Sequence, residues 1–206
     1  MLHKHENVIS MTALSHQATQ QLMPSFSGLP HTQHADGKYR LRRYSVVKHL
    51  NGHVVEIGPR NFVQSDEINH FQGNVVRRFE PIDDAVLQSA AMEEMCNLFA
   101  ESNDLPEGTE IEIHQMRVVA IDNETQVAPE GIHQDGFDHI AMIGIHRQNI
   151  VGGEIMLYAD NHQPPFFKKV LADSKLWHNA TPISAIVPEQ EGHLDLFVLT
   201  ARGEKA

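Results

Sequence analysis

The sequence predicts a mainly β protein with flanking helices, a double-stranded β-helix (jelly roll) that occupies residues 1–206 as one domain. Short extended patterns follow one another after residue 109 and are separated by turn residues, as in β-sandwiches and barrels. Only one strong helical pattern precedes them. The 206 residues, with a hydrophobic content of 41%, can build one core without disulfides.

The chain begins with a polar, His-rich segment at 1–36, which we expect to be partly flexible, with a short helix within 11–23. Residues 39–47 predict a strand. Asn51-Gly52 favours positive backbone angles and predicts a hairpin to a second strand at 54–57. We interpret the arginines at 40, 42 and 43 as a solvated strand face, with an anion site as the alternative.

A further extended segment is expected at 74–79, before the one confident helix. Pro81 and two acidic residues begin this helix, and its apolar stripe continues to about residue 102. Within the stripe, Met92 and Met95 are expected to fill the core. The single cysteine, Cys96, is expected to be a buried thiol rather than a nucleophile.

The second half of the chain is predicted to be strands, at 109–121, 132–135, 140–145, 154–158, 166–171, 176–178, 183–187 and 194–201. Gly152-Gly153 and Pro164-Pro165 fall between them. We interpret the glycine pair as a hairpin turn, although glycine also permits close backbone approach.

Composition excludes several classes of protein. Asp and Glu number 27 against 16 Lys and Arg, giving a net charge of −11, which disfavours nucleic-acid and anionic-membrane partners. No apolar run is long enough to span a membrane, and no signal pattern begins the chain. One cysteine rules out a disulfide framework, so we expect a cytoplasmic protein.

A metal site is predicted from His133 and Asp135, which would lie on the same side of an extended segment. A second histidine, His178, would complete two imidazoles and one carboxylate, the ligand set of non-haem Fe(II) oxygenases. His139 and His146 compete as third ligands, and zinc competes as the metal.

From Tyr39 onward the sequence resembles the bacterial 2-oxoglutarate/Fe(II) dioxygenases that hydroxylate free aliphatic L-amino acids, the L-isoleucine dioxygenase group. The resemblance is carried by residues 40–45, 76–79, 114–117, 132–135, 151–154 and 177–182. These segments occur in the same order over roughly four-fifths of the chain, which is more specific than any single motif.

The resemblance implies that His133, Asp135 and His178 hold iron, with 2-oxoglutarate and molecular oxygen as co-substrates. It implies hydroxylation of an amino acid such as isoleucine, leucine or methionine, with release of succinate and carbon dioxide. Arg77 is the candidate for the substrate carboxylate, and Thr181 is a candidate contact of the co-substrate.

One position departs from the family pattern. Family members carry an arginine at the start of the last strand, which would bind the distal carboxylate of 2-oxoglutarate, whereas this chain has Leu194. Arg117 or His193 is a candidate substitute, although strand alternation would point His193 away from its neighbour. Alternatively, the co-substrate differs, or the chain is a catalytically altered jelly-roll metal-binding protein or sensor. A zinc or manganese isomerase or hydrolase is the third possibility.

Overall fold

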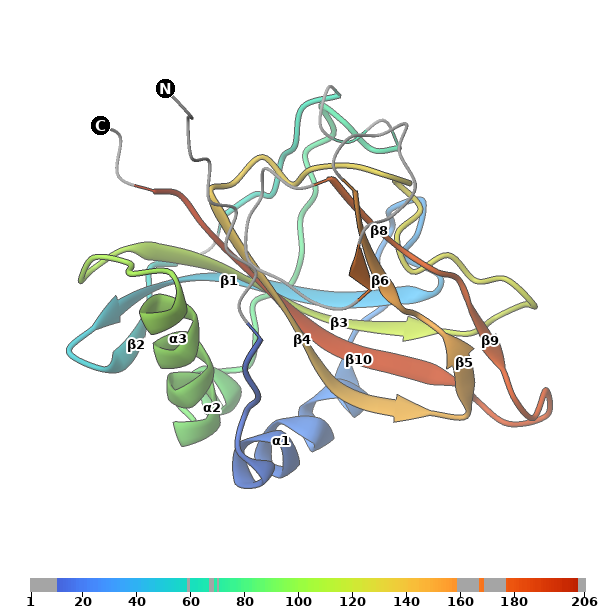
Figure 1. Ribbon diagram of the computed structural model, residues 1–206, viewed down its shortest axis with the longest axis horizontal. Helices are drawn as coiled ribbons and strands as arrows, with labels where there is room; N and C mark the ends of the chain where they lie inside the picture. Colours follow the sequence, from blue (N-terminus) through green and yellow to red (C-terminus); the bar gives the residue numbers. More distant parts are fainter. Residues whose placement is uncertain are drawn as a thin grey trace.

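A five-stranded antiparallel sheet with the order β2-β1-β3-β10-β4 forms the larger layer of the structure (Figure 1). This computed structural model describes residues 11–58, 60–66, 69, 71–158, 167–168 and 177–203, with the backbone alone for 167, 168, 177 and 178. The strands of the sheet are β1 (Arg40–Leu50), β2 (His53–Glu56), β3 (Glu110–Val119), β4 (His139–Gln148) and β10 (His193–Ala201).

The second layer consists of two small sheets. One pairs β5 (Ile150–Gly152) with β9 (Ile183–Ala185), and the other has the order β7-β6-β8, from β7 (Phe167–Lys168), β6 (Ile155–Tyr158) and β8 (Trp177–Ala180). Together the layers form the jelly roll predicted from the sequence.

Helices cover the other face of the large sheet (Figure 1). They are α1 (His16–Leu22), a 3-10 helix η1 (Met23–Gly28), α2 (Asp84–Leu87) and α3 (Ala90–Ser102). Leu22 and Phe26 are buried in one cluster with residues of α3, so much of the N-terminal segment packs into the core. Residues 1–10 lie outside the described part of the chain. No helix among the described residues is long and apolar enough to cross a membrane.

Side chains of β3 and β10 alternate between two cores, as strand geometry requires. Ile113 and Phe197 pack against the helices, where Phe197 meets the ring of Phe26 edge-on at 5.1 Å. Met116 and Leu196 belong to the cluster on the opposite side, under the small sheets. This alternation decides which predicted site residues can meet.

Several predicted elements differ from the observed ones. The predicted single helix is broken, because the Ser89 hydroxyl accepts a hydrogen bond from Met92 N at 3.1 Å and begins α3 as a separate helix. Residues 132–135 and 74–79 form only isolated bridges, at His133 and Arg77. The hairpin at Asn51-Gly52 is confirmed, with φ values of 53° and 79°. Met92, Met95 and Cys96 are buried as predicted, and burial raises the pKa of Cys96 to about 12.

Gly152-Gly153 is not a hairpin turn, so that interpretation was wrong. Strand β5 pairs with β9, and β6 pairs with β7 and β8, so the two glycines pass between different sheets. A Cβ on Gly152 would overlap the carbonyl oxygen of Pro182, and both glycines have positive φ. Close backbone approach is therefore the reason for glycine here.

Candidate metal and anion site

His133 and Asp135 lie together in the loop that leads from β3 to β4. His133 Nε2 is 3.5 Å from Asp135 Oδ1, and the imidazole is mostly buried. The other ring nitrogen, Nδ1, lies 2.7 Å from the carbonyl oxygen of Gly131. Because a carbonyl can only accept, Nδ1 carries a proton, and Nε2 faces Asp135.

The electrostatics of this pair suit a cation. Burial disfavours the charged imidazole, but the hydrogen bond and charge of Asp135, with the charge of Glu130, raise the pKa of His133 to about 9. The same charges would stabilise a divalent ion that takes the place of the proton. These two side chains therefore fit two of the three positions in an iron site.

The third predicted ligand, His178, belongs to β8, where its backbone pairs with Leu157. Its side chain lies outside the described residues. The next two residues of β8, Asn179 and Ala180, line the same cavity as His133 and Asp135. Strand β8 is thus a wall of the cavity into which the two other predicted ligands point.

This cavity lies between the large sheet and strands β6 and β8. Its volume is about 90 Å³. Aliphatic and thioether side chains line part of it, including those of Val127, Met142, Ile155, Leu196 and Val198. Arg40 and Arg42 from β1 and Arg77 from the isolated bridge line another part, beside His133, Asp135 and Glu130.

Arg40 is the arginine whose charge is compensated. Its Nη1 lies 2.7 Å from Asp36 Oδ2 and 2.9 Å from Glu130 Oε1, and all three side chains are less than a tenth exposed. Burial opposes ionisation of both acids, but the charge of Arg40 lowers their pKa values below the usual range. Two carboxylates thus neutralise one guanidinium.

Arg42, two residues farther along β1, has no carboxylate partner among the described residues. Its Nη2 donates to Met116 Sδ at 3.2 Å, and its guanidinium lies 5.2 Å from the ring of Phe79. Burial, followed by repulsion from Arg40, lowers the pKa of Arg42 to about 9. The buried cation therefore has no directly paired anion among the described residues, and only the more distant charges of Asp36 and Glu130 favour it.

Arg77 is in a similar position and is 1% exposed. Its Nη2 donates to Gln64 Oε1 at 2.6 Å, its guanidinium lies 4.5 Å from the centre of the Phe62 ring, and Nε has no hydrogen-bond partner in the described part of the chain. Burial lowers its pKa. Arg42 and Arg77 thus line the cavity without a direct ion pair to a described residue, although the charges of nearby carboxylates act on both. The interpretation of the β1 arginines as a solvated face was wrong for Arg40 and Arg42.

Arg117 and His193, the candidate substitutes for an arginine at 194, lie on the opposite, helix-covered face of the sheet. Arg117 pairs directly with Asp195 across β3 and β10, and its guanidinium binds both oxygens of that fully buried carboxylate. His193 is on the same face as Asp195, with Nε2 at 3.6 Å from Oδ2. Neither side chain lines the cavity of His133 and Asp135.

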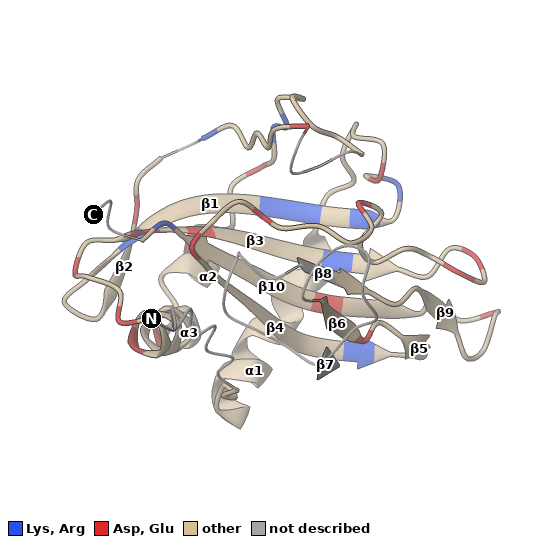
Figure 2. Ribbon diagram, turned by 45° about the horizontal axis from the view of Figure 1, so that its top comes forward, with Lys and Arg blue, Asp and Glu red and all other residues tan. Residues whose placement is uncertain are grey.

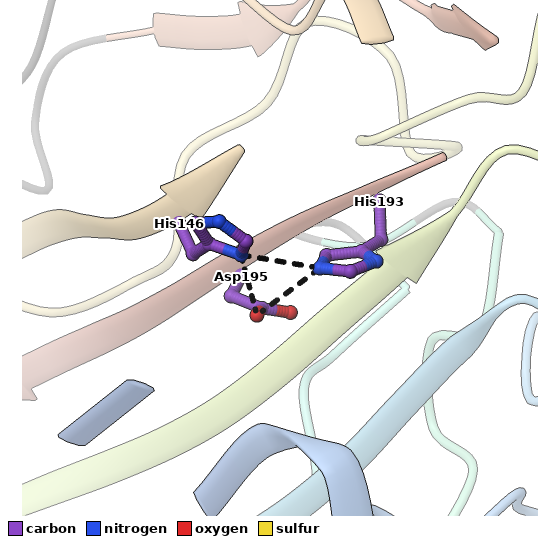
Figure 3. Close-up of side chains that lie close together, drawn as sticks. All are labelled: His146, His193 and Asp195. Atoms are coloured by element: carbon purple, nitrogen blue, oxygen red, sulfur yellow. Dashed lines mark hydrogen bonds and ion pairs between the residues drawn. The ribbon is translucent and has the colours of Figure 1, made fainter. Parts of the chain in front are cut away.

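His146, His193 and Asp195 form one group of described residues that could hold a metal ion, with ligand atoms within 4.8 Å of one another (Figure 3). This group is not the predicted one and lies across the sheet from it. Arg117 already binds both oxygens of Asp195, and its positive charge disfavours a metal ion there. His139, the other rival ligand, is instead 3.1 Å from Asn103 Oδ1.

Leu194 and Thr181 lie at one end of the layer that contains the cavity. Leu194 is buried in the cluster with Ile183 and Leu196. Thr181 follows β8, and its hydroxyl donates to Glu154 Oε2 at 2.6 Å. The structure thus puts an aliphatic side chain where the resemblance leads us to expect a guanidinium.

Comparison with known proteins agrees with this architecture. The sequence model of the family described as 2OG-Fe dioxygenase matches residues 23–200. Among solved structures, a bsmA homolog from Methylobium petroleophilum PM1 has 26% identity and a TM-score of 0.76, with 92% of this chain and 83% of that chain covered. No curated protein matches the chain.

Two more distant structures share the fold. IDO from Bacillus thuringiensis has 19% identity and a TM-score of 0.69, over 92% of this chain and 87% of that chain. The Fe(II)/(alpha)ketoglutarate-dependent dioxygenase TqaL has 12% identity and a TM-score of 0.61, over 91% and 75% of the two chains.

Proposed function

Because the chain belongs to the 2OG-Fe dioxygenase family, we propose that it hydroxylates a free aliphatic L-amino acid and releases succinate and carbon dioxide. The family uses Fe(II) and 2-oxoglutarate, with molecular oxygen as the oxidant. Bound iron supplies the oxidation of an unactivated C–H bond, coupled to decarboxylation of the 2-oxo acid. The protein supplies ligands, orientation and a cavity with little room for water.

Iron is held, in this proposal, by His133, Asp135 and His178. The Gly131 carbonyl fixes the His133 tautomer so that Nε2 faces the side of Asp135. A hydrogen bond to the second nitrogen of a ligating histidine also orients the ring and raises its basicity. The negative charge of Glu130, which raises the pKa of His133, favours a cation at the same place.

The observation that supports an amino acid as substrate is the pair of buried guanidinium groups, Arg42 and Arg77, beside His133 and Asp135. A carboxylate bound between them would accept hydrogen bonds from both guanidinium groups and give Arg77 Nε a partner. The aliphatic wall formed by Ile155, Leu196 and Val198 suits the side chain of isoleucine, leucine or methionine. The substrate would thus be held at its carboxylate and along its alkyl chain.

The test is succinate formation by Fe(II)-loaded protein with 2-oxoglutarate and oxygen, across a panel of L-amino acids and the corresponding amines. We expect turnover with an aliphatic amino acid and none with the amine that lacks its carboxylate. His133→Ala should abolish turnover, while His139→Ala, which changes a histidine bound to Asn103, should retain it. Equal turnover of acid and amine would contradict the role of the arginines.

Leu194 favours a second candidate, a metal-binding jelly roll without oxygenase activity. Its side chain packs among aliphatic residues and cannot bind a carboxylate. In that case the protein would bind metal through His133, but 2-oxoglutarate would not increase the affinity for the metal. No amino acid would support succinate formation.

A further inference from the structure

Arg147 on β4 is the direct cross-strand neighbour of Leu194 on β10. Directly paired residues of antiparallel strands point to the same face and have Cβ atoms about 5 Å apart. The register shifts between Asp195 and Leu196, so that His146 pairs with Asp195 and Arg147 pairs with Leu194. This irregularity puts Arg147 on the face of Leu194, away from the cluster of Asp195.

The side chain of Arg147 reaches the same place as that of Leu194. A Cβ built on Gly153 would lie 3.2 Å from Arg147 Nη1 and 3.4 Å from Leu194 Cδ2, so both groups border one point. Strand β4, which carries Arg147, lies beside β10 (Figure 2). A guanidinium is therefore present next to position 194, although it comes from another strand.

The guanidinium of Arg147 has N–H groups that the hydrogen bond to Gly152 does not use. Nη2 donates to the Gly152 carbonyl oxygen at 2.6 Å, and no carboxylate among the described residues pairs with the side chain. Arginine has five N–H donors, so the edge that Gly152 leaves unused can bind a carboxylate with two hydrogen bonds. Because the side chain is exposed, it can also adjust its position when a ligand enters.

Position 194 lies close to the cavity along β10, although neither Leu194 nor Arg147 lines it. Leu196, two residues along the same face of β10, lines the cavity with His133 and Asp135, and two residues of a strand span about 7 Å. An extended five-carbon diacid has a length of the same order as this spacing. Thr181, the other candidate contact of the co-substrate, borders Gly153 through the hydrogen bond from Gly153 N to its carbonyl oxygen.

We propose that Arg147 binds the distal carboxylate of 2-oxoglutarate and thereby replaces an arginine at position 194. The inference rests on the proposed function, since it assigns a residue to the co-substrate of that site. It leaves Arg42 and Arg77 for the substrate carboxylate. It also removes the reason for regarding the chain as inactive, because the missing guanidinium is supplied from β4.

The experiment compares 2-oxoglutarate with 2-oxopentanoate, which has the same carbon chain without the distal carboxylate. Binding of each acid to Mn(II)-loaded full-length protein is measured by calorimetry, so that the readout does not depend on turnover. The wild-type protein should prefer 2-oxoglutarate by about ten- to a hundredfold, as expected for a charge-assisted bidentate contact.

Arg147→Gln can still donate to Gly152 but cannot bind a carboxylate as a guanidinium does. We expect this variant to lose most of the preference, because it should bind 2-oxoglutarate more weakly and 2-oxopentanoate with unchanged affinity. Leu194→Arg, added to this variant, should restore the preference. Arg78→Gln, a change at an exposed arginine, is the matched control and should keep the wild-type preference.

Three outcomes would overturn the assignment. Arg147 does not hold the distal carboxylate if Arg147→Gln keeps the wild-type preference, or if Arg42→Gln rather than Arg147→Gln loses it. In both cases the proposed function stands. If the wild-type protein binds neither acid in a Mn(II)-dependent way, the proposed function fails and the assignment fails with it.

Discussion

Arg117 and Asp195 form a bidentate ion pair on the helix-covered face of the sheet, with Nε to Oδ1 at 2.6 Å and Nη2 to Oδ2 at 2.8 Å. The pair is cross-strand, since Arg117 on β3 lies directly opposite Asp195 on β10. Asp195 is fully buried, so the guanidinium compensates a charge that has no access to water. Arg117 is therefore a structural partner of Asp195, and its charge is not directed at the cavity.

Arg117→Met should lower the free energy of unfolding by about 3–5 kcal/mol, because it leaves the Asp195 carboxylate buried without its partner. Urea unfolding measures this change. Adding Asp195→Leu should recover most of the loss, since an apolar pair replaces the ionic one. The folded fraction should bind 2-oxoglutarate with the affinity of the wild type. A loss of that affinity would indicate that Arg117 binds the co-substrate.

Arg40 and Arg42 lie two residues apart on one strand, but their replacement by Met should affect the free energy of unfolding differently. Arg40→Met leaves Asp36 and Glu130 without their cation and should lower the free energy of unfolding by about 3 kcal/mol. Arg42→Met removes a buried cation that has no direct ion pair with a described residue and should leave stability unchanged or raise it by about 1–2 kcal/mol.

Functional assays complete this comparison. Arg42→Met and Arg77→Met should raise KM for the amino acid by at least about tenfold, as expected when a charged hydrogen-bond partner is lost. The measurement is succinate formation against amino-acid concentration. If Arg42→Met destabilises the fold as strongly as Arg40→Met, the account of a buried cation without a direct ion pair, kept for a ligand, is wrong.

Asp36 should contribute to the pH dependence of stability. Burial alone would raise its pKa, but the charges of Arg40 and Arg42 and a hydrogen bond from Gln72 lower it below the usual value. A carboxyl whose pKa is lower in the folded state stabilises above its unfolded pKa of about 4, and this contribution is lost as pH falls through the folded pKa.

Unfolding by urea from pH 7 to pH 2 tests this prediction. Asp36→Asn should be less stable than wild type at pH 7 and should lose less stability between pH 5 and pH 2. Glu189→Gln, which changes an exposed carboxylate, should follow the wild-type curve. Parallel curves for wild type and Asp36→Asn would contradict the assignment.

Gly152→Ala should destabilise the fold by about 2–4 kcal/mol, because the added Cβ meets the Pro182 carbonyl and the backbone has φ of 82°. Gly28→Ala is the matched control, since no atom lies within 4 Å of its added Cβ. That substitution should be neutral or stabilise by about 0.5 kcal/mol. Thermal unfolding of both variants measures the difference, and equal effects would refute the close approach.

The sequence predicted the features that depend on local pattern. Strand alternation placed His193 on the face opposite Leu194, as observed. The dipeptide Asn51-Gly52 predicted a hairpin because its turn chemistry is local. The break before α3 was missed, although Ser89 is a typical residue to begin a helix and was the available signal.

Features that depend on distant contacts were not predictable in this way. Arg42 is buried because Phe79 and Met116 cover it, and these residues come from other parts of the chain. Arg147 was missed because its position opposite Leu194 follows from a register shift that leaves no mark in the sequence. The burial of a charged side chain and the register of a bulged strand are both properties of the assembled sheet.

The location of the metal is the central claim, and a metal titration tests it most directly. Calorimetry with Mn(II) should show one tight site in wild type and in His193→Ala, and a loss of more than about a hundredfold in affinity in His133→Ala. His193 belongs to the cluster across the sheet, so the two variants separate the candidate sites. Tight binding that survives in His133→Ala and disappears in His193→Ala would contradict the account.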